Sequence, residues 1–463
     1  MKKGLMASYL DGIVDFTHGE SYGRIMRYFL PEFVTALLLY SLPIWVDAYF
    51  ISRLQSTSLY STLGATNNLL HLILKIAEGV SVGTIILAGR HNGAGDFKAA
   101  GRTIRDAFWV TILLGVSFSS MLYFGAHYIY SWYVPAELVD TGAAFLQLRA
   151  FGVFFMFVFF AFIGFLRGLK DARTPMCLYV VGSITFLLFD YLLIFGNYGF
   201  PEMGLYGSAL ASIIQYGLML LLAMVIVFCG KKYRKYSIEL FSGLSDVSYW
   251  KELIKLSIPV IIDKAMMAIA LVWLLRLIKS LGACGVASFC IIKDLERVAL
   301  LPAVAFAQVI TFLVSNDLGA KNWDGVKSNI KKILFLATIM VFTIIILFSC
   351  YTTFIVKFFD TRSEFTHVAA QVFPVLGFLV FFDVLQIILS GALRGLANVK
   401  VVMWVRFLVL SCYFFPVSYV MSQLAIDDPA VKIILIFGSY YTGNALMSFI
   451  YVNRFRGNDW KKS

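Results

Sequence analysis

The feature that most restricts the fold of this chain is a series of long apolar segments separated by short polar ones. A helix needs about 20 mostly apolar residues to cross the hydrocarbon core of a bilayer. Backbone groups in lipid must be paired within a helix or a closed barrel, and the alternating pattern of a membrane barrel is absent. We therefore expect an all-α membrane protein with twelve transmembrane helices, at residues 27–51, 60–88, 106–130, 141–165, 175–196, 204–229, 252–281, 285–315, 329–356, 368–393, 400–424 and 430–455.

The composition supports a lipid-covered surface. Of the 463 residues, 60% are hydrophobic and only 14% are charged, whereas soluble proteins carry about 25% charged residues. The formal net charge is +12, which in a soluble protein would suggest a nucleic-acid partner. Here the basic residues lie between the apolar segments, so we expect membrane lipid and not nucleic acid as the partner.

The loops on the two sides of the expected bundle differ strongly in Lys and Arg. One set of loops, together with both termini, carries almost all of these residues. The opposite loops hold only about four, namely Arg53, Lys279, Lys357 and Arg362. Cytoplasmic loops of membrane proteins carry an excess of Lys and Arg. We therefore expect an integral protein of the cytoplasmic (inner) membrane with both termini in the cytoplasm.

The chain contains an internal repeat. Three pairs of features recur 226–228 residues apart: Pro31 and Pro259, Gly93–Asp96 and Gly319–Asn322, and Gly164–Leu169 and Gly391–Leu396. The repeat predicts two six-helix bundles that enter the membrane in the same direction, at residues 27–229 and 252–455. The remaining parts are a cytoplasmic lead-in (1–26), a cytoplasmic linker (230–251) and a cytoplasmic tail (456–463).

Two such bundles are typical of secondary transporters, which bind substrate between the halves and move around it. The sequence lacks a G-x-x-x-x-G-K-[ST] loop for nucleotide phosphates, an H-E-x-x-H motif and a G-x-S-x-G motif. We therefore expect a transporter and not an enzyme, with a small organic substrate, and we expect a monomer.

Acidic residues within the apolar segments are the first candidate functional groups, because a carboxylate at the centre of a membrane helix costs about 2.5–3.5 kcal/mol on insertion scales. Asp47 and Asp190 lie at similar depth in the first half, where they could share a cavity and bind H⁺ or Na⁺. Asp383 lies deep in segment 368–393 with no adjacent base. We predict ion-coupling roles for Asp47, Asp190 and Asp383. The alternative for Asp47 and Asp190 is an interfacial acid bonded to its neighbours.

Further charged residues have closer bases. Lys264 follows Asp263, but adjacent side chains on a helix point to different sides, so these two are not expected to pair. Asp263 could bind substrate or form a structural ion pair between helices. Glu296 is also a candidate for substrate binding, although it lies in a group that can neutralise itself locally, Lys293, Asp294, Glu296 and Arg297. Lys75 and Glu78 have the spacing of a structural pair.

Segment 141–165 contains an aromatic run around Phe155 and Met156. Aromatic faces attract organic cations, and Met and Phe adapt to varied shapes. Phe155 and Met156 are therefore candidate substrate contacts. The alternative is that these side chains face lipid or neighbouring helices.

Several motifs together resemble the multidrug and toxic compound extrusion (MATE) family. They are Val46–Ile51, Asn92–Asp96, Leu166–Met176, Asp190–Gly196 and Phe200–Gly204 in the first half, and Asp294–Glu296, Leu318–Ala320 and Leu393–Gly395 in the second. The resemblance implies two bundles in a V-shaped arrangement, which export organic, often cationic, compounds by alternating access in exchange for H⁺ or Na⁺. It implies no cofactor besides the coupling ion. Asp47, Asp190, Glu296 and Asp383 match acids of the family that act in coupling or substrate binding.

The sequence also departs from the family pattern. Phe186 stands where many members have Asn, Met267 where many have an acid, and Asp294 where an arginine is expected. The bases Lys264, Arg276 and Lys293 are additional, and they could pair internally or suit an anionic phosphate group. A flippase or exporter of a lipid-linked or anionic substrate in the same superfamily is therefore the alternative to a multidrug antiporter.

Overall fold

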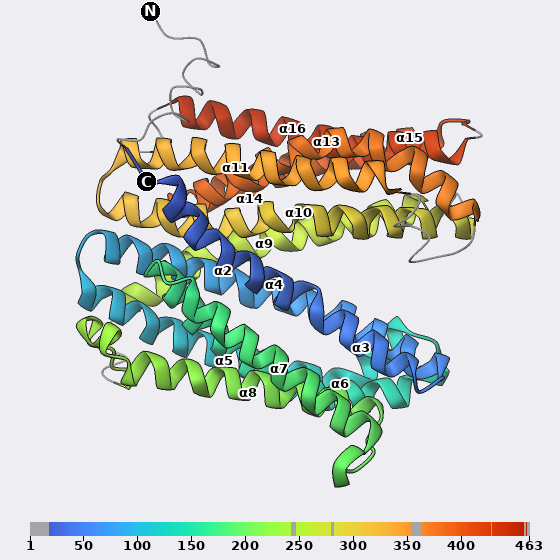
Figure 1. Ribbon diagram of the computed structural model, residues 1–463, viewed down its shortest axis with the longest axis horizontal. Helices are drawn as coiled ribbons and strands as arrows, with labels where there is room; N and C mark the ends of the chain where they lie inside the picture. The colour runs from blue at the N-terminus through green and yellow to red at the C-terminus, as the bar shows by residue number, and fades with distance from the viewer. Residues whose placement is uncertain are drawn as a thin grey trace, which may run out of the picture. The chain divides into compact units, whose positions relative to one another are not determined.

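The computed structural model describes residues 18–241, 247–278, 282–352, 363–426, 428–457 and residue 460. All regular structure in these residues is helical (Figure 1). The helices are α2 (Tyr22–Tyr40), α3 (Leu42–Ser52), α4 (Thr57–Gly93), α5 (Phe97–Tyr133), η1 (Ala136–Leu138), α6 (Val139–Gly168), α7 (Arg173–Phe195), η2 (Asn197–Gly199), α8 (Leu205–Cys229), η3 (Lys231–Tyr236), α9 (Val247–Ile278), α10 (Gly282–Gly319), α11 (Trp323–Cys350), α13 (Ser363–Gly395), α14 (Val399–Val409), η5 (Leu410–Phe414), α15 (Phe415–Gln423) and α16 (Pro429–Arg456).

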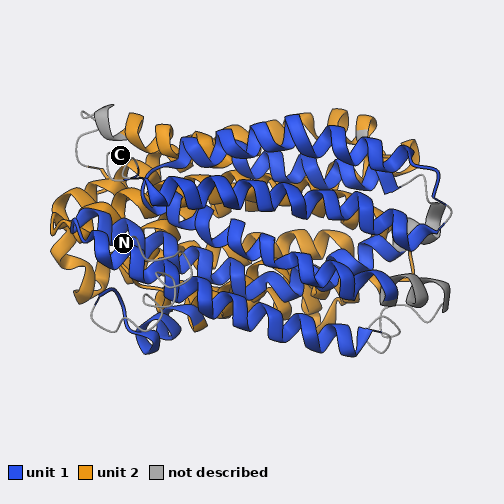
Figure 2. Ribbon diagram, turned by 90° about the horizontal axis from the view of Figure 1, so that it is seen from above, with its two compact units in different colours: residues 1–29, 262–463 blue, residues 30–261 orange. Residues whose placement is uncertain are grey.

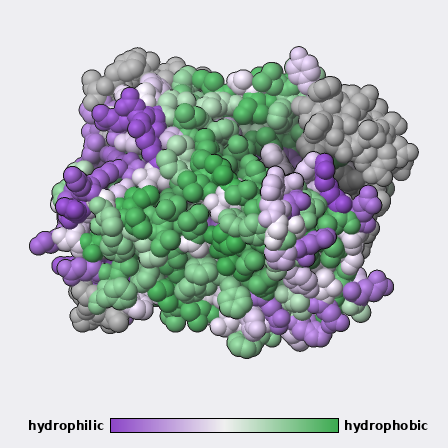
Figure 3. Space-filling model, turned by 60° about the horizontal axis from the view of Figure 1, so that its bottom comes forward, coloured by the Kyte–Doolittle hydropathy of each residue, from purple (hydrophilic) through white to green (hydrophobic). Residues whose placement is uncertain are grey.

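Twelve helical spans in the described residues are long and apolar enough to cross a membrane, which confirms the predicted all-α class and number of spans. The helices extend past several predicted segments. The third span, predicted at 106–130, runs from Phe97 to Trp132. The prediction began too late because Arg102 and Arg105 lower the local hydropathy, although they do not end the helix. The face drawn in Figure 3 is broadly apolar, and its hydrophilic groups gather toward the left and right edges.

The described residues form two compact units, coloured separately in Figure 2. Unit 1 comprises Met1–Phe29 and Ile262–Ser463, and unit 2 comprises Leu30–Ile261. The first helix of each half of the repeat is therefore divided, since α2 and α9 each begin in one unit and continue in the other.

Parts of three segments expected from the sequence lie outside the described residues. They are residues 1–17 of the lead-in, 242–246 of the linker, and 458–459 and 461–463 of the tail.

Helix α6 forms the centre of unit 2. It packs against α4, α5 and α8, and its aromatic run is largely inside the unit. The phenylalanines of this run with essentially no exposed surface are Phe157, Phe159, Phe160, Phe162 and Phe165. Most of this run is therefore packing, as the alternative interpretation of these aromatic residues allowed. In unit 1, the corresponding central helices are α10 and α13, which pack against each other and against α11 and α16.

The repeated loop segments have the same local structure in both units. The side chain of Asp96 accepts a hydrogen bond of 3.0 Å from the Ala99 N–H and thereby caps α5. Asn322 caps α11 in the same way through the Gly325 N–H at 3.0 Å. Side-chain oxygens at this position satisfy backbone donors that the first helical turn leaves free. The repeated residues therefore begin the same helix in each half.

Two spans are interrupted along their length. The first span breaks at Ser41, and Pro43 lies in the first turn of α3. Proline is well tolerated there because its missing N–H is not needed at a helix start. The eleventh span contains a π-helical turn, η5, between α14 and α15, and such turns are often found at functional sites.

The segment after α8 packs onto unit 2. Lys232 and Tyr233 donate hydrogen bonds of 2.6 and 2.5 Å to Oδ2 of Asp171, in the loop between α6 and α7. Burial disfavours the charged form of Asp171, but these bonds outweigh it and hold the pKa of the carboxyl below its ordinary value. The indole N–H of Trp109 donates to the Leu240 carbonyl at 2.9 Å. Residues 231–240 of the expected linker therefore form part of the packed structure of unit 2.

The same segment approaches α5 so closely that residue 101 must be glycine. A Cβ at Gly101 would lie 1.9 Å from the backbone carbonyl oxygen of Tyr236. We expect Gly101→Ala to lower the free energy of unfolding by about 1–3 kcal/mol, the usual cost of overpacking. Thermal unfolding of purified protein in detergent measures this loss. Gly217→Ala is the matched control, because a Cβ there meets no atom within 4 Å, and an equal loss in both variants would contradict the prediction.

Candidate functional site

The break in the first span positions Asp47 inside unit 2. Asp47 lies one turn beyond Pro43 on α3, and only 2% of its surface is exposed. Its Oδ1 accepts a hydrogen bond of 2.5 Å from the Ser208 hydroxyl on α8. Its Oδ2 lies 3.7 Å from Nη2 of Arg149 on α6. The Asp47 carboxylate thus accepts one hydrogen bond from a hydroxyl and forms one longer ion pair with a guanidinium.

Asp190 on α7 is buried completely, with no exposed surface. Neither of its carboxylate oxygens has a hydrogen-bond donor among the described residues. The charged groups that act on it electrostatically are Asp47 and Arg149. The structure therefore places Asp190 within electrostatic reach of Asp47, although only Asp47 lines the cavity described below. It adds a base that the sequence analysis did not single out.

Arg149 is the residue that the sequence analysis missed. It projects from the middle of a strongly apolar span, and its Nη2 donates a hydrogen bond of 2.8 Å to Oδ1 of Asn67 on α4. Its side chain is nine-tenths buried, and its Nε has no acceptor among the described residues. The available signal was a single charged residue within an apolar segment.

A cavity of about 120 Å³ opens beside these residues within unit 2. Its polar lining residues are Asp47, Asn67, His71, Arg149, Ser212, Gln215 and Tyr216. Met156 and Phe186 belong to its apolar wall, whereas Phe155 is absent from the lining. Phe155 packs its ring against Phe154 at a centroid distance of 5.5 Å. The two predicted substrate contacts on α6 thus have different surroundings.

Unit 1 contains a second buried cluster. Lys293 and Glu296 on α10 form an ion pair of 2.8 Å, and Asn444 on α16 donates a hydrogen bond to Oδ1 of Asp383 on α13. Asp383 and Glu296 both act on Lys293 electrostatically. The Lys293 ammonium also lies 5.1 Å from the centre of the Phe437 ring. The structure therefore brings Glu296 and Asp383 together, with Lys293 as their base.

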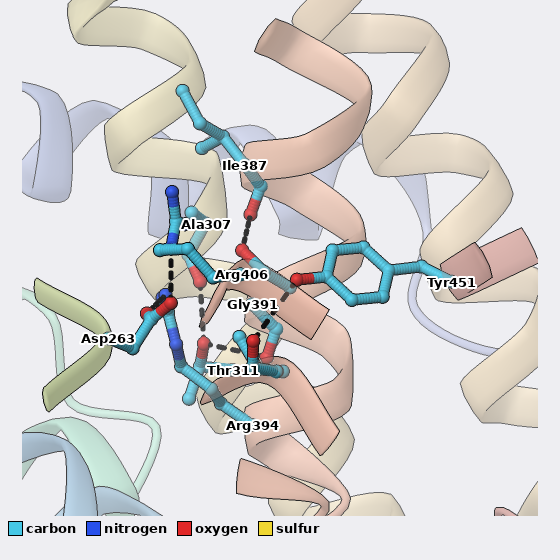
Figure 4. Close-up of polar contacts among 10 residues, drawn as sticks. Asp263, Ala307, Thr311, Ile387, Gly391, Arg394, Arg406 and Tyr451 are labelled. Carbon is cyan, nitrogen blue, oxygen red and sulfur yellow. Dashed lines mark hydrogen bonds and ion pairs between the residues drawn. The ribbon is translucent and has the colours of Figure 1, made fainter. Parts of the chain in front are cut away.

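Asp263 on α9 is engaged by two arginines (Figure 4). Its Oδ2 accepts a hydrogen bond of 2.5 Å from Nη2 of Arg394, and its Oδ1 accepts one from Nε of Arg406. The carboxylate is 1% exposed. As expected, its partner is not the adjacent Lys264. This geometry is that of an interhelical ion pair, which was the structural alternative to substrate binding.

An equivalent pair exists in unit 2. Arg167 forms two parallel hydrogen bonds to Glu32, of 2.9 Å from Nε and 2.7 Å from Nη2. Arg167 and Arg394 occupy matching positions of the repeat, at the ends of α6 and α13. In both units, this arginine thus ties the fourth span to an acid on the first, at Glu32 in one half and Asp263 in the other.

Two of the additional bases, Arg276 and Lys293, have partners of their own. Arg276 lies over the ring of Trp273, with 6.0 Å between the guanidinium carbon and the ring centre. Lys293 is paired with Glu296. Within the part of the chain that the structure describes, no group of three or more His, Cys, Asp or Glu residues is arranged to hold a metal ion.

A known family model matches each half of the internal repeat separately. The MatE family model matches residues 31–192 and again residues 259–420. The two matched stretches begin and end 228 residues apart, which confirms the internal repeat. The chain is 23% identical over 438 residues to the probable multidrug resistance protein YoeA of Bacillus subtilis, covering 91% of this chain and 94% of that protein. It is also 23% identical over 366 residues to a probable multidrug resistance protein NorM of Thermotoga maritima, covering 78% of each.

Solved structures share the fold. A multidrug resistance MATE family transporter of the MOP superfamily, described in an outward-facing conformation, matches with a TM-score of 0.85 at 17% identity, over 95% of this chain and 96% of that one. A MOP superfamily transporter from Pyrococcus furiosus matches with the same TM-score and identity, over 94% and 95%. The family model covers well over half of the chain, in both halves of the repeat. The chain is therefore an integral membrane protein that belongs to the MATE family of multidrug efflux transporters.

Proposed function

We propose that the protein is a cation-coupled antiporter that exports organic, amphipathic or cationic compounds, and that Asp190 binds the coupling H⁺ or Na⁺. One observation carries the proposal: Asp190 is fully buried, and neither of its carboxylate oxygens has a donor among the residues that the structure describes. A buried carboxylate without a partner is costly unless it takes up a proton or another cation. Such residues in membrane helices are functional by default.

The surroundings of Asp190 support this role. Asp47 is near enough to act on it, so negative charge accumulates where a cation would be taken up. Asp47 also lines the adjacent cavity, so a positively charged group in the cavity would sense the same pair of acids. A substrate and the coupling ion can then compete for one centre, as antiport by alternating access requires.

We further propose that the coupling ion is the only cofactor and that Asp383, with Glu296, serves the second half of the protein. The excess of Lys and Arg on one set of loops supports a cytoplasmic (inner) membrane location with both termini in the cytoplasm. The alternative substrate, a lipid-linked or anionic compound, has less support. Two of the three bases that favour it already have partners within the protein, since Lys293 is paired with Glu296 and Arg276 lies over Trp273.

The test is ethidium efflux from proteoliposomes that contain purified protein under an imposed H⁺ or Na⁺ gradient. We expect wild type to exchange ethidium under one of the two gradients and Asp190→Asn to lose gradient-driven exchange. Asp140→Asn, which changes an exposed acid at the start of α6, should behave as wild type. Wild-type exchange by Asp190→Asn, at equal reconstituted amounts, would remove Asp190 from the coupling mechanism.

A further inference from the structure

The segment after α8 lies along α5 for about three helical turns. At its start, Nζ of Lys235 lies 4.2 Å from the centre of the Phe97 ring. At its end, the Leu240 carbonyl accepts the hydrogen bond from the indole of Trp109. Phe97 and Trp109 are twelve residues apart, which is about 18 Å of helix, a distance that a nearly extended chain covers in five or six residues. Residues 235–241, which we call the linker strap, therefore run along α5 in the direction of that helix.

The exposed face of α5 changes from basic to apolar beside the linker strap. Lys98 and Arg102, in the first two turns, are exposed. Leu113 and Val116 further along the same face are 62% and 49% exposed. Trp109 lies between the two groups, and tryptophan is enriched where the headgroup region of a bilayer meets the hydrocarbon. The strap therefore ends at the level where lipid headgroups give way to acyl chains.

Phe241 ends the linker strap with an exposed aromatic ring. Its side chain is 81% exposed. The ring meets those of Trp109 and Phe108 edge to face, with centroid distances of 6.1 and 6.5 Å. Phe241 and Trp109 thus form an aromatic pair at the start of the apolar surface, where an acyl chain can cover the ring of Phe241.

The same two segments carry a cluster of unpaired bases. Residues 231–241 contain four bases and one acid, Glu239. Lys232 is paired with Asp171. Five other bases of the two segments are exposed and form no ion pair with any acid that the structure describes, namely Lys98, Arg102, Lys231, Arg234 and Lys235. Like charges gathered on one surface attract an anion, since each of them lacks a counter-ion within the protein.

We propose that this corner of unit 2 binds one anionic phospholipid. The phosphate lies among the side chains of Arg102, Arg234 and Lys235, and an acyl chain covers Phe241 and Trp109. Guanidinium groups bind phosphate through two parallel hydrogen bonds. A phosphatidylcholine headgroup carries its own ammonium group, which offsets its phosphate, so the site prefers a headgroup with net negative charge. The site is independent of the proposed transport function.

The spacing of the basic and aromatic groups favours a phospholipid over a free anion. Arg102 and Trp109 are seven residues apart on α5, which is about 10 Å along the helix. The headgroup region of one leaflet is about 5–8 Å thick, so a single lipid reaches from the bases to the aromatic pair. A free phosphate would use the basic end alone and leave Phe241 exposed.

The experiment measures lipid retained by purified protein in detergent with equal amounts of phosphatidylglycerol and phosphatidylcholine, by mass spectrometry of the intact complex. We expect wild type to retain one phosphatidylglycerol in preference to phosphatidylcholine. The double variant Arg102→Gln with Arg234→Gln should bind phosphatidylglycerol about 25-fold more weakly, since each base near a membrane surface contributes about fivefold. Neither side chain makes an ion pair or ring contact with a described residue, so the variant should fold.

The matched control is the double variant Arg24→Gln with Lys327→Gln. It also removes two exposed bases, but these are paired with Glu20 and Asp324, and we expect less than a twofold change. An equal loss in both double variants would show that only the net charge matters and would overturn the proposal. Equal retention of the two lipids by wild type would overturn it as well.

Two further measurements distinguish a lipid from a free phosphate. Phe241→Ser should weaken phosphatidylglycerol binding about tenfold, the lower end of the range for burial of such a ring. Because Phe241 is largely exposed, this variant tests the site even if the double variant does not fold. Soluble glycerol phosphate in excess should not displace the lipid. Wild-type binding by Phe241→Ser, or displacement by glycerol phosphate, would show that the corner binds a phosphate group alone and would overturn the proposal.

Discussion

Replacement of Asp263 by alanine is expected to lower the free energy of unfolding by about 3–5 kcal/mol, the usual cost of breaking a buried ion pair by removing one partner. Asp263 is the acid that both Arg394 and Arg406 share, and Arg406 is itself only 3% exposed. Its removal leaves two guanidinium groups inside unit 1 without the carboxylate to which both of them are bonded. The yield of monodisperse protein and its thermal unfolding in detergent measure the effect.

The control for this prediction is Asp294→Ala. Asp294 also pairs with an arginine, Arg297, but both side chains are half exposed, and exposed pairs contribute little to stability. We expect this variant to unfold near the wild-type temperature. A loss in Asp263→Ala no larger than that in Asp294→Ala would show that the arginines find other partners and that Asp263 does not hold the helices together.

Replacement of Arg167 by alanine is expected to have an effect of similar size in unit 2, about 3–5 kcal/mol. Glu32 is 1% exposed and accepts both hydrogen bonds of the Arg167 guanidinium, so the variant leaves a carboxylate buried without its partner. The double variant Glu32→Met with Arg167→Met should recover most of the loss. Well-packed apolar side chains often replace a buried ion pair at no cost in stability. Chemical or thermal unfolding of the single and double variants measures both effects.

A partly exposed pair of the same unit is the reference. Arg90 lies 2.6 Å from Glu252, with about a third of each side chain exposed, so Arg90→Ala should change stability much less. If the double variant is as unstable as Arg167→Ala, the loss reflects packing of the two long side chains and not an unpaired charge.

The sequence was sufficient for those features that depend on local spacing. Helices that cross a membrane are recognisable from about 20 apolar residues in a row. The pairs with i, i+3 spacing were also predictable, because a helix brings such side chains to one face. Lys75–Glu78 forms at 3.3 Å as predicted. The group of charges on α10 neutralises itself through Lys293–Glu296 and Asp294–Arg297.

The long-range ion pairs could not be predicted, because their partners lie far apart in the sequence. Glu32 and Arg167 are 135 residues apart. Alignment of the two halves also does not match this pair with Asp263 and Arg394 of unit 1. The arginines at 167 and 394 are in register. Their acid partners are not, since Glu32 directly follows Pro31, whereas Asp263 lies four residues after Pro259. A shift of one helical turn keeps an acid on the same helix face and breaks the sequence correspondence.

Arg149 was missed for a different reason. The segment around Arg149 is so apolar that one charge barely lowers its mean hydropathy. Arg149 also lies within a span, so a count of the bases in loops does not include it. Its role depends on Asn67 and Asp47, which reach it from α4 and α3. Only the packed helices show that the base lies beside the two acids.

The proline at the start of α3 also shapes the wall of the cavity. Pro43 has no N–H, so the carbonyl oxygen of Leu39, four residues earlier, receives no helical hydrogen bond from that position. Leu39 and Pro43 both line the cavity beside Asp47. A peptide carbonyl has a permanent dipole and no proton to gain or lose. The acceptor that Pro43 leaves without its helical donor on Leu39 is therefore the same in acid, where carboxylates become neutral.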